Sequence, residues 1–398
     1  MNLVEIKDFG FSYPESSRKV LEHVNLNIKE GTLNVIMGRS GCGKSTLLRQ
    51  LKSVLAPAGE KEGEILYRNI PLRDTDHRTQ SQEIGFVMQN PDNQIVTDKV
   101  WHELAFGLES LGCDNATIRL RVAEMASYFG IQQWFYKNVT ELSGGQKQLL
   151  NLAAVMAMHP SLLILDEPTS QLDPIAASDF LETVKKINRD IGTTVLLTEH
   201  RLQDIIPYAD RIFVMDEGGV FLEGTPREIG TALGREKHGM FLSMPVPMQI
   251  YVETRSRLTC PLTVSQGRQW IRDYIEEKGI TREQIQQANQ RLAGFTHAQD
   301  NKFPGEAAGS EGKGIFAGLK SKNNTPGPAI QMKGVWFRYE KDSPDVVRDL
   351  SLEVKKGEFY ALVGGNGTGK STTLSLLSRV HQPYKGRIYL EGKDLRSF

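Results

Sequence analysis

The sequence predicts an α/β fold, and three observations carry the prediction. The first two observations are two series of the same kind: each has an apolar run suited to a buried strand, then a glycine-rich loop, then helix-forming sequence. The first series is LNVIM at 33–37, the loop from Gly38, and the segment STLLRQLKSV. The second is FYALV at 359–363, the loop from Gly364, and the segment STTLSLLSRV. The third observation is a further apolar run, LLIL at 162–165, which ends in two acidic residues. Strands that alternate with helices in this way are typical of α/β domains.

The composition indicates a globular protein of more than one domain. The chain has 398 residues, which suffice for two or three domains, and 39% of them are hydrophobic. Lys plus Arg and Asp plus Glu both number 48, so no basic excess would draw the chain onto nucleic acid, and we expect no nucleic-acid partner. The three cysteines are far apart and odd in number, which fits a reducing compartment. Without a signal-peptide pattern or an apolar run long enough to span a bilayer, we expect a cytoplasmic protein.

An internal duplication organises the chain. The offset of 326 positions between Lys44 and Lys370 also relates Phe11 to Phe337 and Tyr13 to Tyr339. A similarity in one register over such a length indicates a repeated domain. We therefore expect a complete domain at 1–230, a small helical extension at 231–296, a flexible Gly/Pro/Asn-rich linker at 297–329, and the N-terminal part of a second domain at 330–398. Within the extension, the spacing of apolar residues predicts an amphipathic helix over 263–279, capped by Thr263 or Ser265.

Each glycine-rich loop has the pattern of a phosphate cradle. Glycines allow the backbone N–H groups to turn inward around a phosphate, and the helix that follows adds the positive end of its dipole. The lysine would reach the β and γ phosphates, and the hydroxyl after it would hold Mg²⁺. We expect nucleotide contacts in the first copy from Gly38, Ser40, Gly41, Gly43, Lys44, Ser45 and Thr46, and in the second from Gly364, Gly367, Gly369, Lys370, Ser371 and Thr372. Ser45 and Ser371 are the candidate Mg²⁺ ligands of the two loops.

The acidic pair after the strand LLIL indicates what happens to the nucleotide. Asp166, at the end of the strand, is placed to hold the Mg²⁺ shell, and Glu167 is placed to polarise a water for attack on the γ-phosphorus. The pair predicts hydrolysis of ATP rather than nucleotide binding alone.

A second candidate anion site stands upstream of the acidic pair, in the segment LSGGQKQ. Ser143, Gly144, Gly145 and Gln146 would present a hydroxyl and backbone N–H groups at a helix N-terminus. These groups cannot serve the phosphate that the first loop already encloses, unless another copy comes face to face with it.

The order of these motifs resembles the nucleotide-binding domain of ATP-binding cassette (ABC) ATPases. The glycine loop, LSGGQ, LLILDEPTSQLD and the histidine of LLTEH follow one another as they do in that family. The resemblance implies a P-loop NTPase fold, with a mixed sheet core, an antiparallel β subdomain and a helical subdomain that carries LSGGQ. It also implies that Tyr13 and Tyr339 stack on adenine, that Gln89 senses Mg²⁺ and the attacking water, and that His200 contacts the γ-phosphate. Asp173, in the segment SQLD, would act across a dimer of cassettes.

Within that family the sequence is similar to the ATPases of energy-coupling factor (ECF) importers. The similarity lies in the stretch after Gln89, in EHRL at 199–202, and in SMPVPMQI at 243–250. It implies a transmembrane coupling subunit, a substrate-binding membrane subunit, and a peripheral position on the inner face of the membrane. The cargo would be a vitamin, a vitamin precursor or a metal ion. An ATPase of another ABC importer type, and a two-cassette ATPase of the translation-factor class acting on ribosomes, are the alternatives, although the linker is not helical and charged as the ribosomal class requires.

The resemblance also implies a composite site, because each site of the family is completed by the signature of a second cassette. The sequence has two glycine loops and one LSGGQ, and 28 positions follow Lys370. The second copy therefore has no counterpart of Gln89, Ser143, Glu167 or His200. We expect a shortened form of a longer two-cassette ATPase, whose second copy folds poorly alone and whose first domain hydrolyses ATP by pairing with a first domain of another chain. Whether the working pair is a homodimer or a heterodimer stays open.

Overall fold

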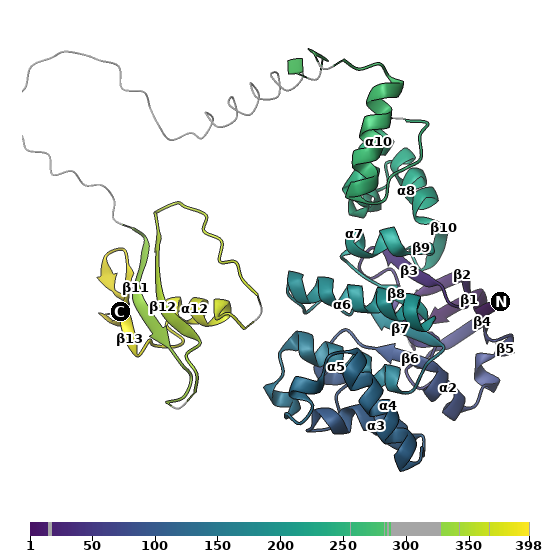
Figure 1. Cartoon of the computed structure of the whole chain (residues 1–398), viewed down its shortest axis with the longest axis horizontal. Coiled ribbons are helices and arrows are strands. Elements are labelled where there is room, and N and C mark those ends of the chain that lie inside the picture. Colours follow the sequence, from purple (N-terminus) through teal and green to yellow (C-terminus); the bar gives the residue numbers. More distant parts are fainter. Residues whose placement is uncertain are drawn as a thin grey trace, which may run out of the picture. The chain divides into compact units, whose positions relative to one another are not determined.

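The computed structural model describes residues 1–14, 18–254, 256–281, 283–284, 286–287, 328–341, 343–365 and 367–397. The chain divides into two compact units, Met1–Tyr274 and Ile275–Phe398, and each is described by itself (Figure 1). The linker predicted at 297–329 lies outside the described residues except for 328 and 329, and so does 288–296 of the predicted extension.

A six-stranded mixed sheet forms the centre of the first unit, in the order β10-β9-β3-β8-β7-β6. Its strands are β6 (Ile84–Val87), β7 (Leu162–Asp166), β8 (Thr194–Thr198), β3 (Leu33–Gly38), β9 (Arg211–Asp216) and β10 (Gly219–Gly224). The first five are parallel, and β10 pairs antiparallel with β9. Every residue of β7 and β8 is buried, as continuous apolar runs in a covered parallel sheet require. The strands predicted at 33–37 and 162–165 are confirmed.

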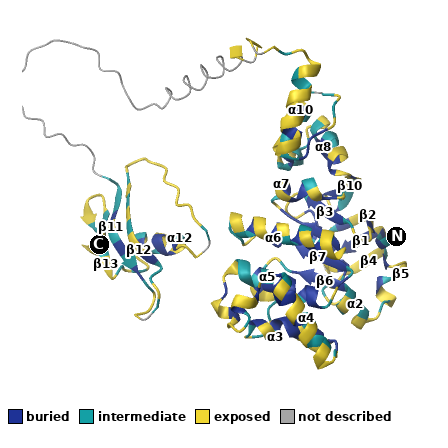
Figure 2. Cartoon of the chain, in the orientation of Figure 1, coloured by how far each residue is buried: buried dark blue, intermediate teal, exposed yellow. Residues whose placement is uncertain are grey.

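The sheet has a hydrophobic core on each face. On one face, side chains of alternate strand positions such as Val35, Leu163 and Leu197 pack against helices. On the other, Ile36, Ile164 and Leu196 pack toward a second, antiparallel sheet in the order β2-β1-β4-β5. That sheet consists of β1 (Asn2–Ser12), β2 (Leu21–Lys29), β4 (Glu60–Tyr67) and β5 (Ile70–Pro71), and α1 (Lys44–Gln50) and α2 (His77–Glu83) follow strands β3 and β5. Figure 2 shows the strands of the central sheet as buried, along with parts of the helices.

Helices cover the remaining face and form the helical part of the unit (Figure 1). They are α3 (Val100–Ser110), α4 (Asn115–Tyr128), α5 (Gly144–Ala157), α6 (Pro174–Lys186), α7 (Leu202–Ile205) and α8 (Pro226–Arg235). Side chains accept hydrogen bonds from the free N–H groups at several of their starts: Asp114 for α4, Ser143 for α5, Asp173 for α6 and Thr225 for α8. In the part of the chain that the structure describes, no helix combines the length and the apolar character needed to cross a bilayer.

Two more helices follow the core of the first unit, α9 (Val246–Thr254) and α10 (Val264–Glu277). The helix predicted at 263–279 is confirmed as α10, and Thr263 caps it by accepting a hydrogen bond from the N–H of Gln266 (3.2 Å). Trp270 is 5% exposed and packs its ring against that of Tyr251 on α9. The apolar face of α10 therefore anchors the helix on α9.

The second unit repeats the antiparallel sheet of the first. Its strands β11 (Ile330–Phe337), β12 (Val347–Val354), β13 (Lys385–Leu390) and β14 (Lys393–Asp394) lie in the order β12-β11-β13-β14. This order matches β2-β1-β4-β5 strand for strand. Helix α12 (Lys370–Leu377) follows the second glycine loop, and Leu376 packs with Met332, Phe337 and Ile388 in a small core.

The predicted strand at 359–363 is wrong. The structure has no strand there, and Phe359 and Val363 are 96% and 91% exposed. The corresponding strand β3 is hydrogen-bonded between β8 and β9, which supply partners on both sides. The described residues of the second unit offer the segment FYALV no such partners. An apolar run becomes a buried strand only where neighbouring strands complete its hydrogen bonds.

A buried glutamine in the first unit gives a prediction on stability. Gln50, near the end of α1, is 3% exposed, and both polar atoms of its amide are buried without a hydrogen-bond partner. The internal repeat places Leu376 at the equivalent position. Because an unsatisfied buried polar group costs about 1–3 kcal/mol, we expect Gln50→Leu to raise the free energy of unfolding of the first unit by about that amount. Urea unfolding followed by tryptophan fluorescence measures the change.

Gln80 is the matched control for this prediction. It is 2% exposed, but its amide accepts from the N–H of Ser53 (3.1 Å) and donates to the carbonyls of Leu72 (2.9 Å) and Thr75 (2.8 Å). Gln80→Leu should therefore lower the free energy of unfolding. Equal losses of stability in both variants would show that the amide of Gln50 is in fact bonded.

Candidate active site

The first glycine loop joins β3 to α1 at the carboxyl edge of the central sheet. Gly41 and Gly43 have φ values of +80° and +101°, which side chains rarely adopt. A Cβ atom on Gly38 would lie 2.4 Å from the carbonyl oxygen of Met215, on the neighbouring strand. The loop thus depends on glycine for its backbone conformation and for its close approach to β9.

Lys44 lies folded over this loop. Its side chain donates to the carbonyl oxygens of Gly38 (2.9 Å) and Arg39 (3.0 Å), and the residue is 6% exposed. The ammonium group therefore lies at the concave side of the loop, bonded to carbonyls that phosphate oxygens could replace.

Asp166 lies beside the start of α1 because β7 is separated from β3 only by β8. One of its oxygens, Oδ1, accepts hydrogen bonds from the hydroxyls of Ser45 (2.8 Å) and Thr198 (3.1 Å). Burial raises the pKa of the Asp166 carboxyl, and the two hydroxyls act in the opposite direction. A cation at this point would compensate for the buried charge.

Glu167 is the centre of the site. Its Oε2 accepts a hydrogen bond from the side-chain amide of Gln89 (3.2 Å) and lies 3.0 Å from Nε2 of His200. The residue has a φ of +46°, which is rare for a side chain other than glycine. Its N–H donates to the carbonyl and to the hydroxyl of Thr198 (3.2 and 3.0 Å), which fixes this conformation. A strained backbone held in place by its neighbours is typical of functional positions.

The residues around Asp166 fit Mg²⁺. The hydroxyl of Ser45, the carboxylate of Asp166 and the amide oxygen of Gln89 are the oxygen ligands that this ion prefers. In the described part of the chain, no group of three or more His, Cys, Asp and Glu side chains is arranged to hold a metal ion. The three oxygen groups would hold a Mg²⁺ together with the oxygens of a bound phosphate.

The candidate adenine contacts lie next to both loops in the same way. The hydroxyl of Tyr13 is 3.2 Å from Oγ1 of Thr46, and Tyr13 is 39% exposed. In the second unit the hydroxyl of Tyr339 is 3.0 Å from Oγ1 of Thr372, and Lys370 donates to the carbonyl of Gly364 (2.8 Å). Ser371 has no bonded carboxylate among the described residues. The described residues of the second unit thus repeat the loop and its tyrosine without the acidic part of the site.

The LSGGQ segment forms the start of α5. Ser143 caps the helix: its hydroxyl accepts from the N–H of Gln146 (3.3 Å), whose side chain accepts from the N–H of Ser143 (2.9 Å). Ser143 and Gly144 are exposed, and Gly145 and Gln146 are partly exposed. None of the hydrogen bonds of the cluster around Glu167 involves these four residues. The structure thus presents them as an accessible helix N-terminus.

Sequence reasoning missed Thr198 and Glu199, which shape the site from β8. Thr198 pairs in register with Asp166 on β7, so its hydroxyl reaches both acidic residues. Glu199 is 4% exposed and accepts three hydrogen bonds from backbone N–H groups. The segment LLTEH contains both residues, but their contacts follow from the pairing of two strands that are distant in the sequence.

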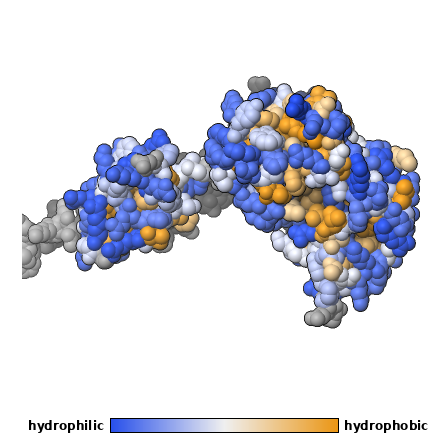
Figure 3. All heavy atoms as spheres, turned by 90° about the horizontal axis from the view of Figure 1, so that it is seen from below, coloured by the Kyte–Doolittle hydropathy of each residue, from blue (hydrophilic) through white to orange (hydrophobic). Residues whose placement is uncertain are grey.

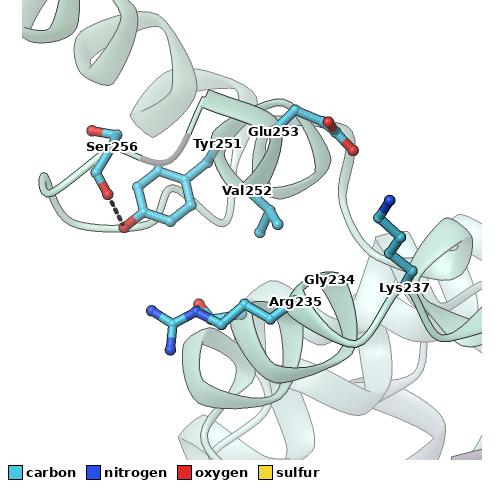
Figure 4. A pocket seen from close by; sticks show the side chains of 8 residues that line it. Gly234, Arg235, Lys237, Tyr251, Val252, Glu253 and Ser256 are labelled. Carbon is cyan, nitrogen blue, oxygen red and sulfur yellow. Dashed lines mark hydrogen bonds between the residues drawn. The ribbon is translucent and has the colours of Figure 1, made fainter.

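A separate cavity of about 560 Å³ lies between α8 and α9 (Figure 4). Tyr251 borders it and donates its hydroxyl to the carbonyl of Ser256 (3.1 Å). None of the candidate site residues lines this cavity; its walls are formed by Thr231, Gly234, Arg235, Lys237, Tyr251, Val252, Glu253 and Ser256. The cavity is thus distinct from the cluster around Glu167.

Comparison with known proteins agrees with this geometry. The family model described as ABC transporter matches residues 21–170 and 347–397. A putative ABC transporter ATP-binding protein of Bacillus anthracis is 36% identical over 98% of the chain, and a putative HMP/thiamine import ATP-binding protein, YkoD, of Bacillus subtilis is 29% identical over the whole chain. The chain spans 64% and 65% of the lengths of these two relatives.

Solved structures show the same fold. CbiO1 of Clostridium perfringens, part of the ABC transporter complex cbiONQ, superimposes with a TM-score of 0.53 at 31% identity, over 61% of this chain and 97% of that one. A dimeric ATP-binding cassette, MJ0796, in a post-hydrolysis state with ADP and phosphate, gives 0.50 at 29% identity, over 56% of this chain and 99% of that one. The family match covers the glycine loop, the LSGGQ segment and the acidic pair of the first unit, together with the glycine loop of the second. The chain therefore belongs to the ABC transporter family as an ATP-binding protein.

Proposed function

We propose that the first unit binds Mg-ATP and hydrolyses it, and that the chain is the energising ATPase of a membrane importer. The observation that carries the first part is the convergence of Gln89 and His200 on Oε2 of Glu167, next to the contact between Ser45 and Asp166. A carboxylate, an imidazole and an amide at one point, beside a phosphate loop and a Mg²⁺ ligand set, fit the hydrolysis of a phosphoanhydride.

The proposal assigns a role to each residue of the site. Tyr13 stacks on adenine, the loop from Gly38 to Thr46 encloses the β and γ phosphates, and Lys44 exchanges its carbonyl partners for phosphate oxygens. Mg²⁺ supplies charge neutralisation on the phosphates, with Ser45, Asp166 and Gln89 placed to hold it. Glu167 takes the proton of the attacking water, and His200, which is 56% exposed in its side chain, is free to contact the γ-phosphate. Gln89 orients the carboxylate.

The site needs the α5 N-terminus of a second cassette. Ser143 and Gly144 are accessible and take no part in the cluster around Glu167, so they are suited to the phosphate of a facing site. The similarity to a dimeric cassette supports this arrangement. We propose that the first unit of another copy can supply this N-terminus, because it presents the same exposed Ser143 and Gly144.

The surface after Gln89 is the proposed docking site for a transmembrane subunit. Val96, Trp101 and Tyr136 are 66%, 41% and 81% exposed. They belong to segments joined by a hydrogen bond from the N–H of Trp101 to the carbonyl of Phe135 (3.2 Å). Apolar residues also reach the surface of the first unit on the side viewed in Figure 3, on which α3 and α4 lie in Figure 1. Clustered exposed apolar residues of this kind mark interaction surfaces.

Helix α5 connects this surface to the nucleotide. Gln148 donates to the carbonyl of Met88 (3.1 Å), Asn151 to that of Pro91 (3.1 Å), and Lys147 forms an ion pair with Asp92 (2.6 Å). The segment that follows Gln89 is thus bonded to the helix that begins at Ser143. If hydrolysis of the γ-phosphate displaced Gln89, the docking surface and α5 would move with it.

The proposal also extends to the class of importer. The names of YkoD, an HMP/thiamine import protein, and of CbiO1, part of cbiONQ, support an importer of the ECF type for a vitamin, a vitamin precursor or a metal ion. The partners would be a transmembrane coupling subunit and a substrate-binding membrane subunit, with the ATPase at the inner face of the membrane. An ATPase of another ABC importer type is the second candidate.

Phosphate release by the purified chain tests the enzymatic part of the proposal. We expect release from ATP in the presence of Mg²⁺ and none after chelation of the metal, because the buried Asp166 requires a cation to engage the phosphates. Release at an equal rate in EDTA, or no release under any condition, would overturn the proposed hydrolysis.

Membrane co-purification tests the coupling part. We expect the parent chain to co-purify with membranes that contain its transport partners, and Trp101→Glu to be lost from them, because a charge in a buried interface is costly. Val54→Glu, at an exposed apolar position (61%) after α1 and outside α3 and α4, is the matched control and should remain bound. Co-sedimentation with ribosomes instead of membranes would favour the translation-factor class.

A further inference from the structure

We propose that Glu199 is a positioning residue for hydrolysis, which fixes the backbone of His200 against the segment Thr169–Pro174. The inference rests on the proposed function, because it gives His200 its role at the γ-phosphate. The segment 169–174 follows Glu167, contains Asp173 and ends at Pro174, the first residue of α6.

Both oxygens of Glu199 are occupied by backbone N–H groups from two segments. Oε1 accepts from the N–H of Thr169 (3.1 Å), and Oε2 accepts from the N–H groups of His200 (3.0 Å) and Arg201 (3.3 Å). Glu199 and Thr169 are 4% and 3% exposed. Among the described residues no cation pairs with Glu199, so the three N–H groups stabilise its charge. One buried carboxylate thus joins the two segments at their backbones.

Arg201 forms a second connection between the same segments. Its guanidinium donates to the carbonyl of Pro174 (3.2 Å). The residues on either side of His200 are therefore both bonded to the chain between Glu167 and α6, one at Thr169 and the other at Pro174. His200 is held between these two points, while its imidazole remains more than half exposed and 3.0 Å from Glu167.

This arrangement assigns Glu199 a positioning role rather than a catalytic one. Its oxygens bond to main-chain groups and to neither the imidazole of His200 nor the carboxylate of Glu167. Because the backbone at residue 200 is fixed, the positions that the imidazole of His200 can occupy are restricted. The fixed backbone also means that a displacement of residues 169–174, the segment that contains Asp173, shifts His200 with it. Glu199 thereby links the position of His200 to that of the segment before α6.

Glu199→Gln tests the inference with little change of shape. The amide keeps one acceptor oxygen but replaces the other by a donor, so one of the two segments loses its bonds. Since small misplacements of reacting groups cost up to about 10²-fold in rate, we expect kcat for ATP hydrolysis to fall by roughly tenfold or more. The Kd for a non-hydrolysable ATP analogue with Mg²⁺ should stay within about twofold, because the hydrogen bonds of Glu199 lie outside the glycine loop. Glu182→Gln, which removes an exposed carboxylate on α6, should change neither quantity.

A double-mutant cycle with His200 distinguishes positioning from a general loss of structure. If Glu199 acts through His200, then Glu199→Gln should lower kcat in the parent and have no further effect in His200→Ala. Losses that multiply in the double variant, or an equal loss of ATP affinity, would overturn the inference. A parent without ATPase activity would overturn the proposed function itself. An active parent that slows on His200→Ala and not on Glu199→Gln would overturn the inference alone.

Discussion

Glu167→Gln is expected to bind ATP and to retain it unhydrolysed, with a rate of phosphate release reduced by roughly 10²-fold or more. The substitution keeps the size of the side chain and an oxygen that can accept from Gln89, but it removes the negative charge that takes the proton of the attacking water. The φ of +46° at this position is set by the hydrogen bonds of its N–H to Thr198, which the substitution does not touch. The chain should therefore stay folded and lose only the chemical step.

Two measurements distinguish a role of Glu167 in activating water from a role in nucleotide binding. Rapid quench with labelled ATP gives the rate of cleavage, and equilibrium binding gives the affinity, each compared with Glu182→Gln as the control for loss of a carboxylate. Cleavage by Glu167→Gln at the parent rate would show that another group activates the water. A loss of binding together with cleavage would place Glu167 in nucleotide binding instead.

Lys44→Ala is expected to abolish hydrolysis and the binding of ATP at the first loop, whereas Lys370→Ala is expected to leave hydrolysis nearly unchanged. The two lysines occupy equivalent loops and make equivalent bonds to carbonyl oxygens of those loops. In the part of the chain that the structure describes, the first loop lies next to a carboxylate pair, through the bond between Ser45 and Asp166, and the second does not. Removing a preorganised donor to the phosphates typically costs 10²-fold or more in rate, so we expect a loss of roughly that size for Lys44.

This pair of variants also tests whether hydrolysis takes place at the first glycine loop and not at the second. Steady-state phosphate release and binding of a fluorescent ATP analogue should fall for Lys44→Ala, and residual binding of the analogue should depend on Lys370. A fall in hydrolysis for Lys370→Ala as large as that for Lys44→Ala would mean that the second unit contributes to catalysis and that the division of roles is wrong.

The elements that the sequence predicted correctly are those with local signals. The strands at 33–37 and 162–165 are continuous apolar runs that need no knowledge of their neighbours. The helix at 263–279 follows from the spacing of residues such as Trp270, which is buried as expected. The meeting of Lys44, Asp166, Glu167, Gln89 and His200 required the family resemblance, since these residues come from four separate segments of the chain.

What could not be predicted depends on contacts between distant segments. The segment FYALV at 359–363 has the pattern of a strand but lies exposed, because a strand in a parallel sheet requires partner strands. Thr198 and Glu199 look like ordinary residues next to a histidine until the register between β7 and β8 places one against Asp166 and the other against Thr169. The unpaired amide of Gln50 likewise follows from packing, since a glutamine in a helix gives no sign of its burial.

The measurement that tests the central proposal most directly mixes two inactive variants, Lys44→Ala and Ser143→Arg. Each should be inactive alone, the first because its loop cannot hold the phosphates and the second because its arginine blocks the facing site. In a mixed pair, the intact loop and Glu167 of the Ser143→Arg chain would face the intact Ser143 of the Lys44→Ala chain. Random two-fold pairing should then restore roughly a quarter of the parent rate. A mixture as inactive as its separate components would contradict a site shared between two cassettes.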